Sequence, residues 1–435
     1  MQQLESLGTL MVAPEISARA IRMAAIWRSG FRPLFLAGSL FGLTAMSLWL
    51  YGYTSPSGGR IALFAQREWH GHEMIFGFGG AMCGGFLLTA IPSWARTPEI
   101  AGRKLGFLVA AWCLGRSAML LSPLLPPAAT AAADLLYLPL LMFYIAPTVW
   151  HAHNHHYRWA LPILGASFGG NLMFHFAMIA GDGLAAHQGV IVGYYSLMVL
   201  YSIIAGLLTP IFTQTWLEEN NLAAIAPICP VLEWLSVLSV VFLAVADIAE
   251  SPLLPVQLSA VAALAINTLR MSRWHSIHIV KSALLLPMHL GYFLFLSSIL
   301  LRGVSAIYSL GNMSSAVHAF TIGAWGLTKF SLMTRVSLKH TGRPLVVPAS
   351  MKVAFVSIGL AAAVRVLASF DYRPTILLPV AAVLWLAPLA FYLFTFASIL
   401  LRPSVGRTDG NQNEGTLFPR EVDRTRVSRI EEDAR

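Results

Sequence analysis

The sequence predicts an all-α, polytopic integral membrane protein of about twelve transmembrane helices. Of its 435 residues, 57% are hydrophobic and only 11% are charged, whereas about 25% of a typical soluble domain is charged. Mean hydropathy is +0.67, and apolar runs of the length that crosses a bilayer, about 20 residues, recur along the chain. These runs are continuous and not alternating, which excludes a transmembrane β-barrel.

The twelve predicted spans follow from these apolar runs. They lie near 33–53, 70–92, 105–122, 129–150, 160–181, 188–209, 231–249, 252–270, 282–301, 316–337, 348–369 and 376–401. The seventh and eighth spans form a tight hairpin around Ser251 and Pro252. Pro210 is interpreted as the end of the sixth span, because proline interrupts a helix.

The loops predict an orientation with both termini in the cytoplasm, because basic residues concentrate on cytoplasmic loops. The net charge of +9 therefore reports topology and not binding to nucleic acid. Residues 1–30 form a cytoplasmic N-terminal segment without a cleavable signal, residues 31–402 the membrane domain, and residues 403–435 a polar tail expected to be disordered. The three cysteines show no paired motif and predict no disulfide. The basic residues placed inside are Arg96, Arg103, Lys104, Arg158, Arg270, Arg273, Lys281, Arg335, Lys339 and Arg343.

The second span begins with two histidines and a glutamate, in the segment WHGHEMIFGF at 69–78. Ionisable groups inside a membrane are costly and usually functional. Residues two apart point about 200° apart on a regular helix, so His70 and His72 should have different partners. Glu73 falls on the face of His70. Helix-end histidines that simply hydrogen-bond to loops are the alternative interpretation.

The predicted topology gives each histidine a depth. His70, His72, His175 and His318 lie toward the outer face, His289 lies nearest the midplane, and His340 lies at the cytoplasmic end of the tenth span. Imidazole suits copper, iron and zinc, so an outer histidine layer with one deeper histidine is a plausible metal arrangement.

Two histidines have suggestive neighbours on their own helices. Asn171 precedes His175 by four residues, so its amide shares a face with that ring and could orient it; a simple intramembrane hydrogen bond is the alternative. His289 shares a face with Tyr292 and Phe293, an aromatic surround suited to a porphyrin, although such a stripe is more often packing.

Glu73 and Arg116 are the charged candidates beside the outer histidines. Glu73 could relay protons, ligate a metal or orient a histidine, and an ion pair with Arg67 is the competing interpretation. For Arg116 a structural salt bridge with Asp134 is preferred, and contact with a haem propionate is the alternative. The tract HAHNHH at 151–156 is interpreted as a surface cluster without a function.

Several motifs, taken in order, resemble one known family. They are FRPLFL at 31–36, WHGHEMIFGF at 69–78, GGFLLTAIPSW at 84–94, the GR pair at 115–116, NLMFH at 171–175, PIFT at 210–213, MHLGY at 288–292 and the stretch from His318 through MTR (333–335) to HTGRPL (340–345). On these residues the chain is identified as a member of the NnrS family. Leu207 departs from the pattern, since the family is expected to carry an arginine there.

The resemblance implies a bacterial inner-membrane protein that contains b-type haem and copper and acts in denitrification or protection against nitric oxide. The family's histidines fall on His70, His72, His175, His289, His318 and His340. We expect His289 with one outer histidine, His72 or His175, to hold haem with help from Arg116 and Tyr292. His70 or His72 would then hold copper with His318, and Glu73 would deliver protons.

Reduction of nitric oxide would also need an electron donor. The sequence carries no c-type haem motif and no iron–sulfur motif, so a quinol or an external cytochrome would have to serve. A membrane transporter, a non-catalytic handler of metal or metal–nitrosyl species and a sensor are the alternative functions. Inverted repeats with matching helix breaks would favour the transporter, and the sequence shows no clear repeat.

Overall fold

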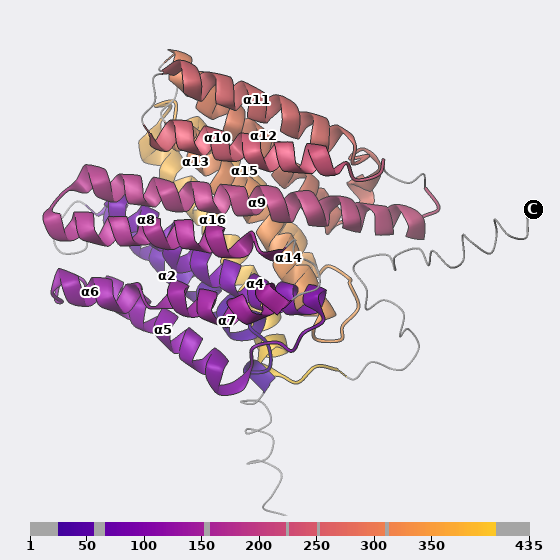
Figure 1. The fold of residues 1–435 in the computed structure, drawn as a ribbon, viewed down its shortest axis with the longest axis horizontal. Coiled ribbons are helices and arrows are strands. Elements are labelled where there is room, and N and C mark those ends of the chain that lie inside the picture. The colour runs from indigo at the N-terminus through magenta and orange to yellow at the C-terminus, as the bar shows by residue number, and fades with distance from the viewer. Residues whose placement is uncertain are drawn as a thin grey trace, which may run out of the picture.

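The computed structural model describes residues 25–55, 66–151, 157–222, 226–249, 253–308 and 313–405, in which every regular element is a helix. Most of the predicted N-terminal segment and tail, the Ser251–Pro252 turn and most of the histidine tract at 151–156 lie outside these residues. Figure 1 shows the helices gathered into one bundle, with α9 crossing its middle between α8 and α10.

Each of the twelve predicted spans coincides with a helical segment. The bounds are α2 (Phe31–Thr54), α3 (Arg67–His72) continued by η2 (Glu73–Gly79) and α4 (Gly80–Ala95), α5 (Gly102–Leu120), α6 (Pro127–Asp134) followed by α7 (Tyr137–His151), α8 (Ala160–Ala180), α9 (Gly183–Glu219), α10 (Pro230–Ile248), α11 (Leu253–Ser272), α12 (Leu285–Tyr308), α13 (Met313–His318) continued by η5 (Ala319–Trp325) and α14 (Gly326–Lys339), α15 (Ala349–Ala368) and α16 (Pro374–Leu401). A short 3-10 helix, η4 (His278–Lys281), precedes α12.

Nine helical segments within the described residues are long and apolar enough to cross a membrane. The other three predicted spans coincide with α5, α11 and the α13–η5–α14 segment. The predicted class, a polytopic helical membrane protein, is confirmed. The number of crossings and the side of each terminus stay predictions.

Pro210 does not end its helix, so that prediction is wrong: α9 runs on for 37 residues to Glu219. Proline is tolerated in membrane helices when hydroxyl side chains satisfy backbone groups near the interruption. Here Thr213 Oγ1 donates to the carbonyl of Thr209 at 2.7 Å. This carbonyl is next to the proline, whereas the carbonyl that loses its regular donor is that of Gly206. The helix is continuous through both positions.

Two stretches of π-helix each begin directly after a histidine. η2 follows His72 in the second predicted span, and η5 follows His318 in the tenth. π-helical turns are rare and often occur at functional sites. They leave backbone carbonyls without regular partners, and side chains supply some of these: Trp112 Nε1 donates to the carbonyl of Gly77 at 2.9 Å.

Helices α8 and α9 approach closely because glycines face each other. A Cβ atom on Gly189 would lie 2.6 Å from the carbonyl oxygen of Gly170, and one on Gly170 would lie 2.7 Å from that of Gly189. Close contact through small residues is how membrane helices gain packing energy. This contact positions the end of α8, with Asn171 and His175, against the centre of the bundle.

Candidate metal centre

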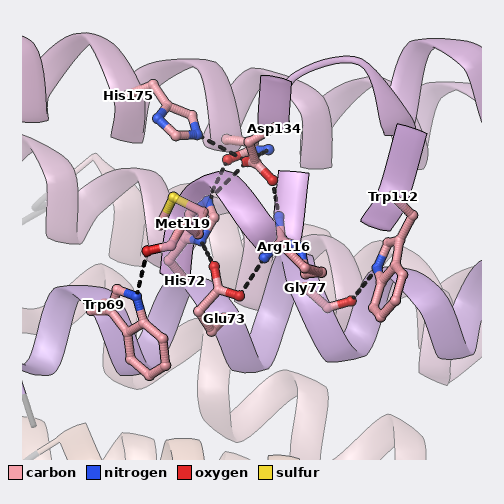
Figure 2. A network of polar contacts seen from close by, with 10 residues as sticks. Trp69, His72, Glu73, Gly77, Trp112, Arg116, Met119, Asp134 and His175 are labelled. Carbon is pink, nitrogen blue, oxygen red and sulfur yellow. Dashed lines mark hydrogen bonds and ion pairs between the residues drawn. The ribbon is translucent and has the colours of Figure 1, made fainter. Parts of the chain in front are cut away.

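Six buried polar side chains meet where α3 and η2 pack against α5, α6 and α8 (Figure 2). All six are at most 5% exposed, and they are His72, Glu73, Arg116, Asp134, Asn171 and His175. Buried polar groups are costly unless they are paired. These groups pair with one another and form one continuous network.

Asp134 lies at the centre of this network, at the last residue of α6. Its Oδ2 accepts hydrogen bonds from Asn171 Nδ2 and His175 Nε2, each at 2.9 Å, and lies 3.2 Å from His72 Nε2. Its Oδ1 forms an ion pair with Arg116 Nη2, which confirms the salt bridge preferred from the sequence. The carboxylate of Asp134 therefore contacts side chains from three helices, α3, α5 and α8.

Glu73 connects the other side of the network. Its Oε1 lies 2.7 Å from His72 Nδ1, and its Oε2 lies 2.5 Å from Arg116 Nη1. The alternative ion pair with Arg67 is wrong, because Arg67 Nη2 instead contacts His187 Nε2 at 2.6 Å. The expected shared face of Glu73 and His70 stays a prediction, because the contacts of the Glu73 carboxylate are with His72 and Arg116.

Gly77 makes room for the arginine. A Cβ atom at this position would lie 2.5 Å from Arg116 Nη1 and 3.0 Å from Glu73 Oε2. Any larger residue would therefore enter the space of the Glu73–Arg116 ion pair. Part of the glycine content of the second span is thus explained by the site and not by helix packing.

Asn171 orients His72, whereas the sequence suggested that it orients His175. Its Oδ1 lies 2.8 Å from His72 Nε2. The amide orientation follows from Asp134, whose carboxylate accepts from Asn171 Nδ2 and so leaves Oδ1 to face the imidazole. Both ring nitrogens of His72 therefore point at oxygen acceptors, Glu73 on one side and Asn171 with Asp134 on the other.

The network lacks one positive charge. Two carboxylates, Glu73 and Asp134, share a single guanidinium, that of Arg116. An uncompensated buried charge costs several kcal/mol or more. A proton on one of the two carboxyl groups would remove this deficit. An imidazolium at His72, which would satisfy both acceptors beside its ring, or a bound metal cation would supply the missing charge.

The donor atoms suit a metal ion. Ligand atoms of His72, Asp134 and His175 lie within 4.8 Å of one another and all three residues are buried. Two imidazole nitrogens and one carboxylate oxygen form a set typical of divalent copper, zinc or non-haem iron. With the metal at His72 Nε2, Glu73 would hold the opposite ring nitrogen, as partners of metal-bound histidines usually do.

A comparison with protein families identifies the chain. The model of the NnrS protein family matches residues 25–404, nearly the whole chain. The chain belongs to the NnrS family. No curated protein matches it. Membership, together with the apolar helices and the His–Asp–His group, makes this a metal-associated, multi-pass membrane protein related to nitric oxide.

His70 of this NnrS chain faces away from the network, as the helical geometry predicted. Its ring packs against Trp49 of α2, with centroids 5.2 Å apart. Its buried Nδ1 has no hydrogen-bond partner among the described residues. The two histidines of the WHGHEM motif therefore have different partners.

His318 lies in the region that His70 faces. Its Nδ1 donates to the carbonyl of Ser314 at 2.7 Å, which leaves Nε2 as a lone-pair donor. His70 is within electrostatic range of His318, and Arg365 of α15 is within range of both. These residues form a second polar region, on the side of α3 opposite His72.

The remaining NnrS histidines lie elsewhere. His289 is the fifth residue of α12, nearer the start of the helix than the midplane, and its two ring nitrogens contact Thr213 Oγ1 at 2.9 Å and Ser276 Oγ at 2.8 Å. His340 caps α14 and its ring packs 5.8 Å from that of Phe31. The structure therefore does not bring the six predicted histidines into one centre.

The aromatic surround predicted for His289 is divided between two environments. Tyr292 is fully buried and donates to Asn267 Oδ1 at 2.8 Å, whereas the side chain of Phe293 is 56% exposed at the surface of the bundle. Sequence reasoning also missed Asp134 as a candidate ligand. An acidic residue inside an apolar span was the signal that could have identified it.

Proposed function

We propose that this NnrS protein binds haem and copper in the bacterial inner membrane, and that it binds nitric oxide and reduces it. The observation that carries the proposal is the buried His72–Asp134–His175 group, which lacks one positive charge. A site of this composition is costly to keep in a membrane without a ligand. A copper ion would supply the missing charge, and the donor set fits it.

We assign copper to His72, Asp134 and His175, and haem to the opposite side of α3. The unpartnered Nδ1 of His70 and the lone pair of His318 Nε2 could coordinate the haem iron, and the positive charge of Arg365 could attract the carboxylates of the haem. His289 is less suited, because both of its nitrogens already contact hydroxyl groups. When bound, the two metals supply electrons and positions for two small ligands.

The protein's own residues would manage the protons that reduction consumes. His72 Nδ1 and Glu73 Oε1 are 2.7 Å apart, so one proton can be held at either atom. Arg116 stabilises the ionised form of Glu73 and fixes its orientation through a second carboxylate oxygen. The pair is fully buried, which keeps bulk water away and strengthens each electrostatic contact. Electrons would come from a quinol or a cytochrome.

The transporter alternative is weaker in this geometry. Transporters with internal repeats place helix interruptions at corresponding positions of both halves. The two π-helical stretches of the described chain lie in the second and tenth predicted spans. These positions do not correspond in two six-helix halves, whether parallel or inverted.

The decisive experiment is anaerobic nitric oxide consumption by purified, metal-analysed protein with a quinol or an artificial donor. Wild type should consume nitric oxide, and His72→Ala should lose both copper and consumption. His278→Ala, at an exposed histidine, is the matched control and should match wild type. Metal-loaded wild type that binds nitric oxide without consuming it would replace reduction by metal handling or sensing.

A further inference from the structure

Lys329 of α14 lies in a box of aromatic rings. Its Nζ is 3.6 Å from the ring centroid of Phe78, 3.9 Å from Trp325, 4.7 Å from Phe330 and 5.4 Å from Trp385. The box joins both π-helical stretches, because Phe78 belongs to η2 and Trp325 to η5. Ring faces attract cations, most strongly where water is excluded. The box is thus built for an ammonium ion and gains little from a neutral amine.

Among the residues that the structure describes, no carboxylate forms an ion pair with Lys329. The side chain is 7% exposed, and Nζ has no hydrogen-bond partner within the part of the chain that the structure describes. Aromatic rings offset part of the desolvation cost but carry no net charge. A cation inside the membrane is usually paired, and an intramembrane ionisable residue therefore points to a ligand.

A cavity of about 60 Å³ adjoins Lys329, between α4, α9 and α14. A water molecule needs roughly 10–15 Å³ of such space, so the cavity can hold one small ion or a few waters. Its wall includes Tyr201 and Thr328, whose hydroxyl oxygens are 3.0 Å apart. In such a pair one hydroxyl can donate to the other and leave a hydrogen for a ligand.

A second cavity, of about 50 Å³, continues toward the end of α14. The two cavities share Phe86 and Leu332 in their walls, and the second is also lined by Arg335, Lys339 and His340. This end is cytoplasmic in the predicted topology. Clustered cations attract anions and raise their local concentration.

A third cavity continues in the opposite direction. It shares Cys83, Leu197 and Leu200 with the cavity beside Lys329 and extends to Phe76. The ring of Phe76 packs against His72, with centroids 5.2 Å apart. The space beside Lys329 therefore lies between the cationic end of α14 and the metal centre.

We propose that the cavity beside Lys329 binds a small inorganic monoanion, of the size of chloride or nitrite, that arrives through the cation-lined cavity. Lys329 Nζ supplies the charge, and the hydroxyl pair of Tyr201 and Thr328 supplies a hydrogen bond. The site is separate from the His72 network, so it stands or falls independently of metal content and of nitric oxide reduction.

The test measures anion binding to purified, detergent-solubilised full-length protein. The melting temperature is recorded while bromide or nitrite replaces gluconate at constant ionic strength. Wild type should show a saturable rise. Lys329→Met should weaken the apparent affinity by about tenfold or more, as loss of a charged hydrogen-bond donor implies. Lys352→Met, at an exposed lysine, should respond as wild type does.

A second variant and a second measurement protect the test against misfolding. Lys329→Arg keeps the charge in the ring box and should retain a saturable response. In bromide-soaked wild-type crystals, the anomalous signal should include a peak in the cavity beside Lys329. The proposal is overturned by a linear, unsaturable response in wild type, by an equal response in Lys329→Met, or by bromide peaks confined to the protein surface.

Discussion

His72 Nδ1 lies 2.7 Å from Glu73 Oε1, although the two residues are adjacent in the chain. Neighbours in a regular helix point about 100° apart. Here the first is the last residue of α3 and the second begins η2, and the change of helix type coincides with this contact. The pair connects His72, a candidate metal ligand, to Arg116 through one carboxylate. Several measurable consequences follow from the charges.

In metal-free protein, replacing Arg116 should lower the free energy of unfolding more than replacing Asp134 does. Arg116→Met leaves two buried carboxylates without their cation, at a cost of about 3–5 kcal/mol. Asp134→Asn leaves Arg116 paired with Glu73 and should cost about 1–3 kcal/mol through weakened hydrogen bonds, while also abolishing metal binding. Denaturation midpoints and metal analysis check both, with Asp371→Asn at an exposed turn as control. Equal destabilisation by the two variants would refute the charge argument.

Copper binding should release about one proton, because His72 must surrender the proton on Nε2 when that nitrogen ligates a metal. Calorimetric titration of metal-free protein with copper, in buffers of different ionisation enthalpy, measures the number of protons released. The same titration with Asp134→Asn should show little binding heat. Binding to wild type without proton release would mean that His72 is neutral before the metal arrives.

Gly77→Ala should disturb the site through size alone. The added methyl group would lie 2.5 Å from Arg116 Nη1, and overpacking of this kind costs about 1–3 kcal/mol. Gly77→Ala should therefore be less stable than wild type and should also contain less copper. Gly165→Ala is the matched control, since a Cβ there meets nothing within 4 Å, and alanine favours a helix by up to about 1 kcal/mol. Equal melting temperatures of the two variants would show that the close contact at Gly77 does not affect stability.

Glu73→Gln should separate metal binding from proton handling. Glu73 is outside the His72–Asp134–His175 group, so copper should remain near wild-type occupancy. Nitric oxide consumption should fall by about 100-fold or more, in the range seen when a general acid or base is lost. Glu68→Gln, one turn earlier at a half-buried acid, serves as control. Unchanged turnover would remove Glu73 from the proposed proton route.

Haem should depend on the residues opposite His72. His70→Ala and His318→Ala should lose the Soret absorbance of haem and keep copper, because neither residue belongs to the copper group. His289→Ala should retain haem, since its ring nitrogens contact Thr213 and Ser276. Optical spectra and metal analysis of the same preparations decide the matter. Loss of haem from His289→Ala alone would restore the assignment made from the sequence.

Helical periodicity predicted local geometry well where the helix is regular. The divergence of His70 and His72 followed from the rotation per residue, and the structure confirms it because α3 is an ordinary α-helix. The contact of Glu73 with His72 was not predicted, because no single-sequence pattern revealed that η2 begins there. Apolar length placed every predicted span on a helix, since the bilayer fixes how long such a run must be.

Contacts between distant segments were not predictable in the same way. Asn171 contacts His72 across 99 residues of chain, and its spacing from His175 suggested a different partner. Nothing in either segment encodes how α8 approaches α3; the glycine contact between α8 and α9 contributes to it. Lys329 carried a usable signal, a lysine deep in an apolar span, and the sequence reasoning overlooked it.

The placement of His70 and His72 on opposite sides of α3 has a mechanical consequence. Only Gly71 separates them in the chain, so the two imidazoles share one short rigid body. A sideways shift of that body toward α8 would press His72 against Asn171 and draw His70 away from Trp49 of α2. A ligand that moves one imidazole would therefore also move the other. The two sides of α3 are mechanically coupled through this short helix.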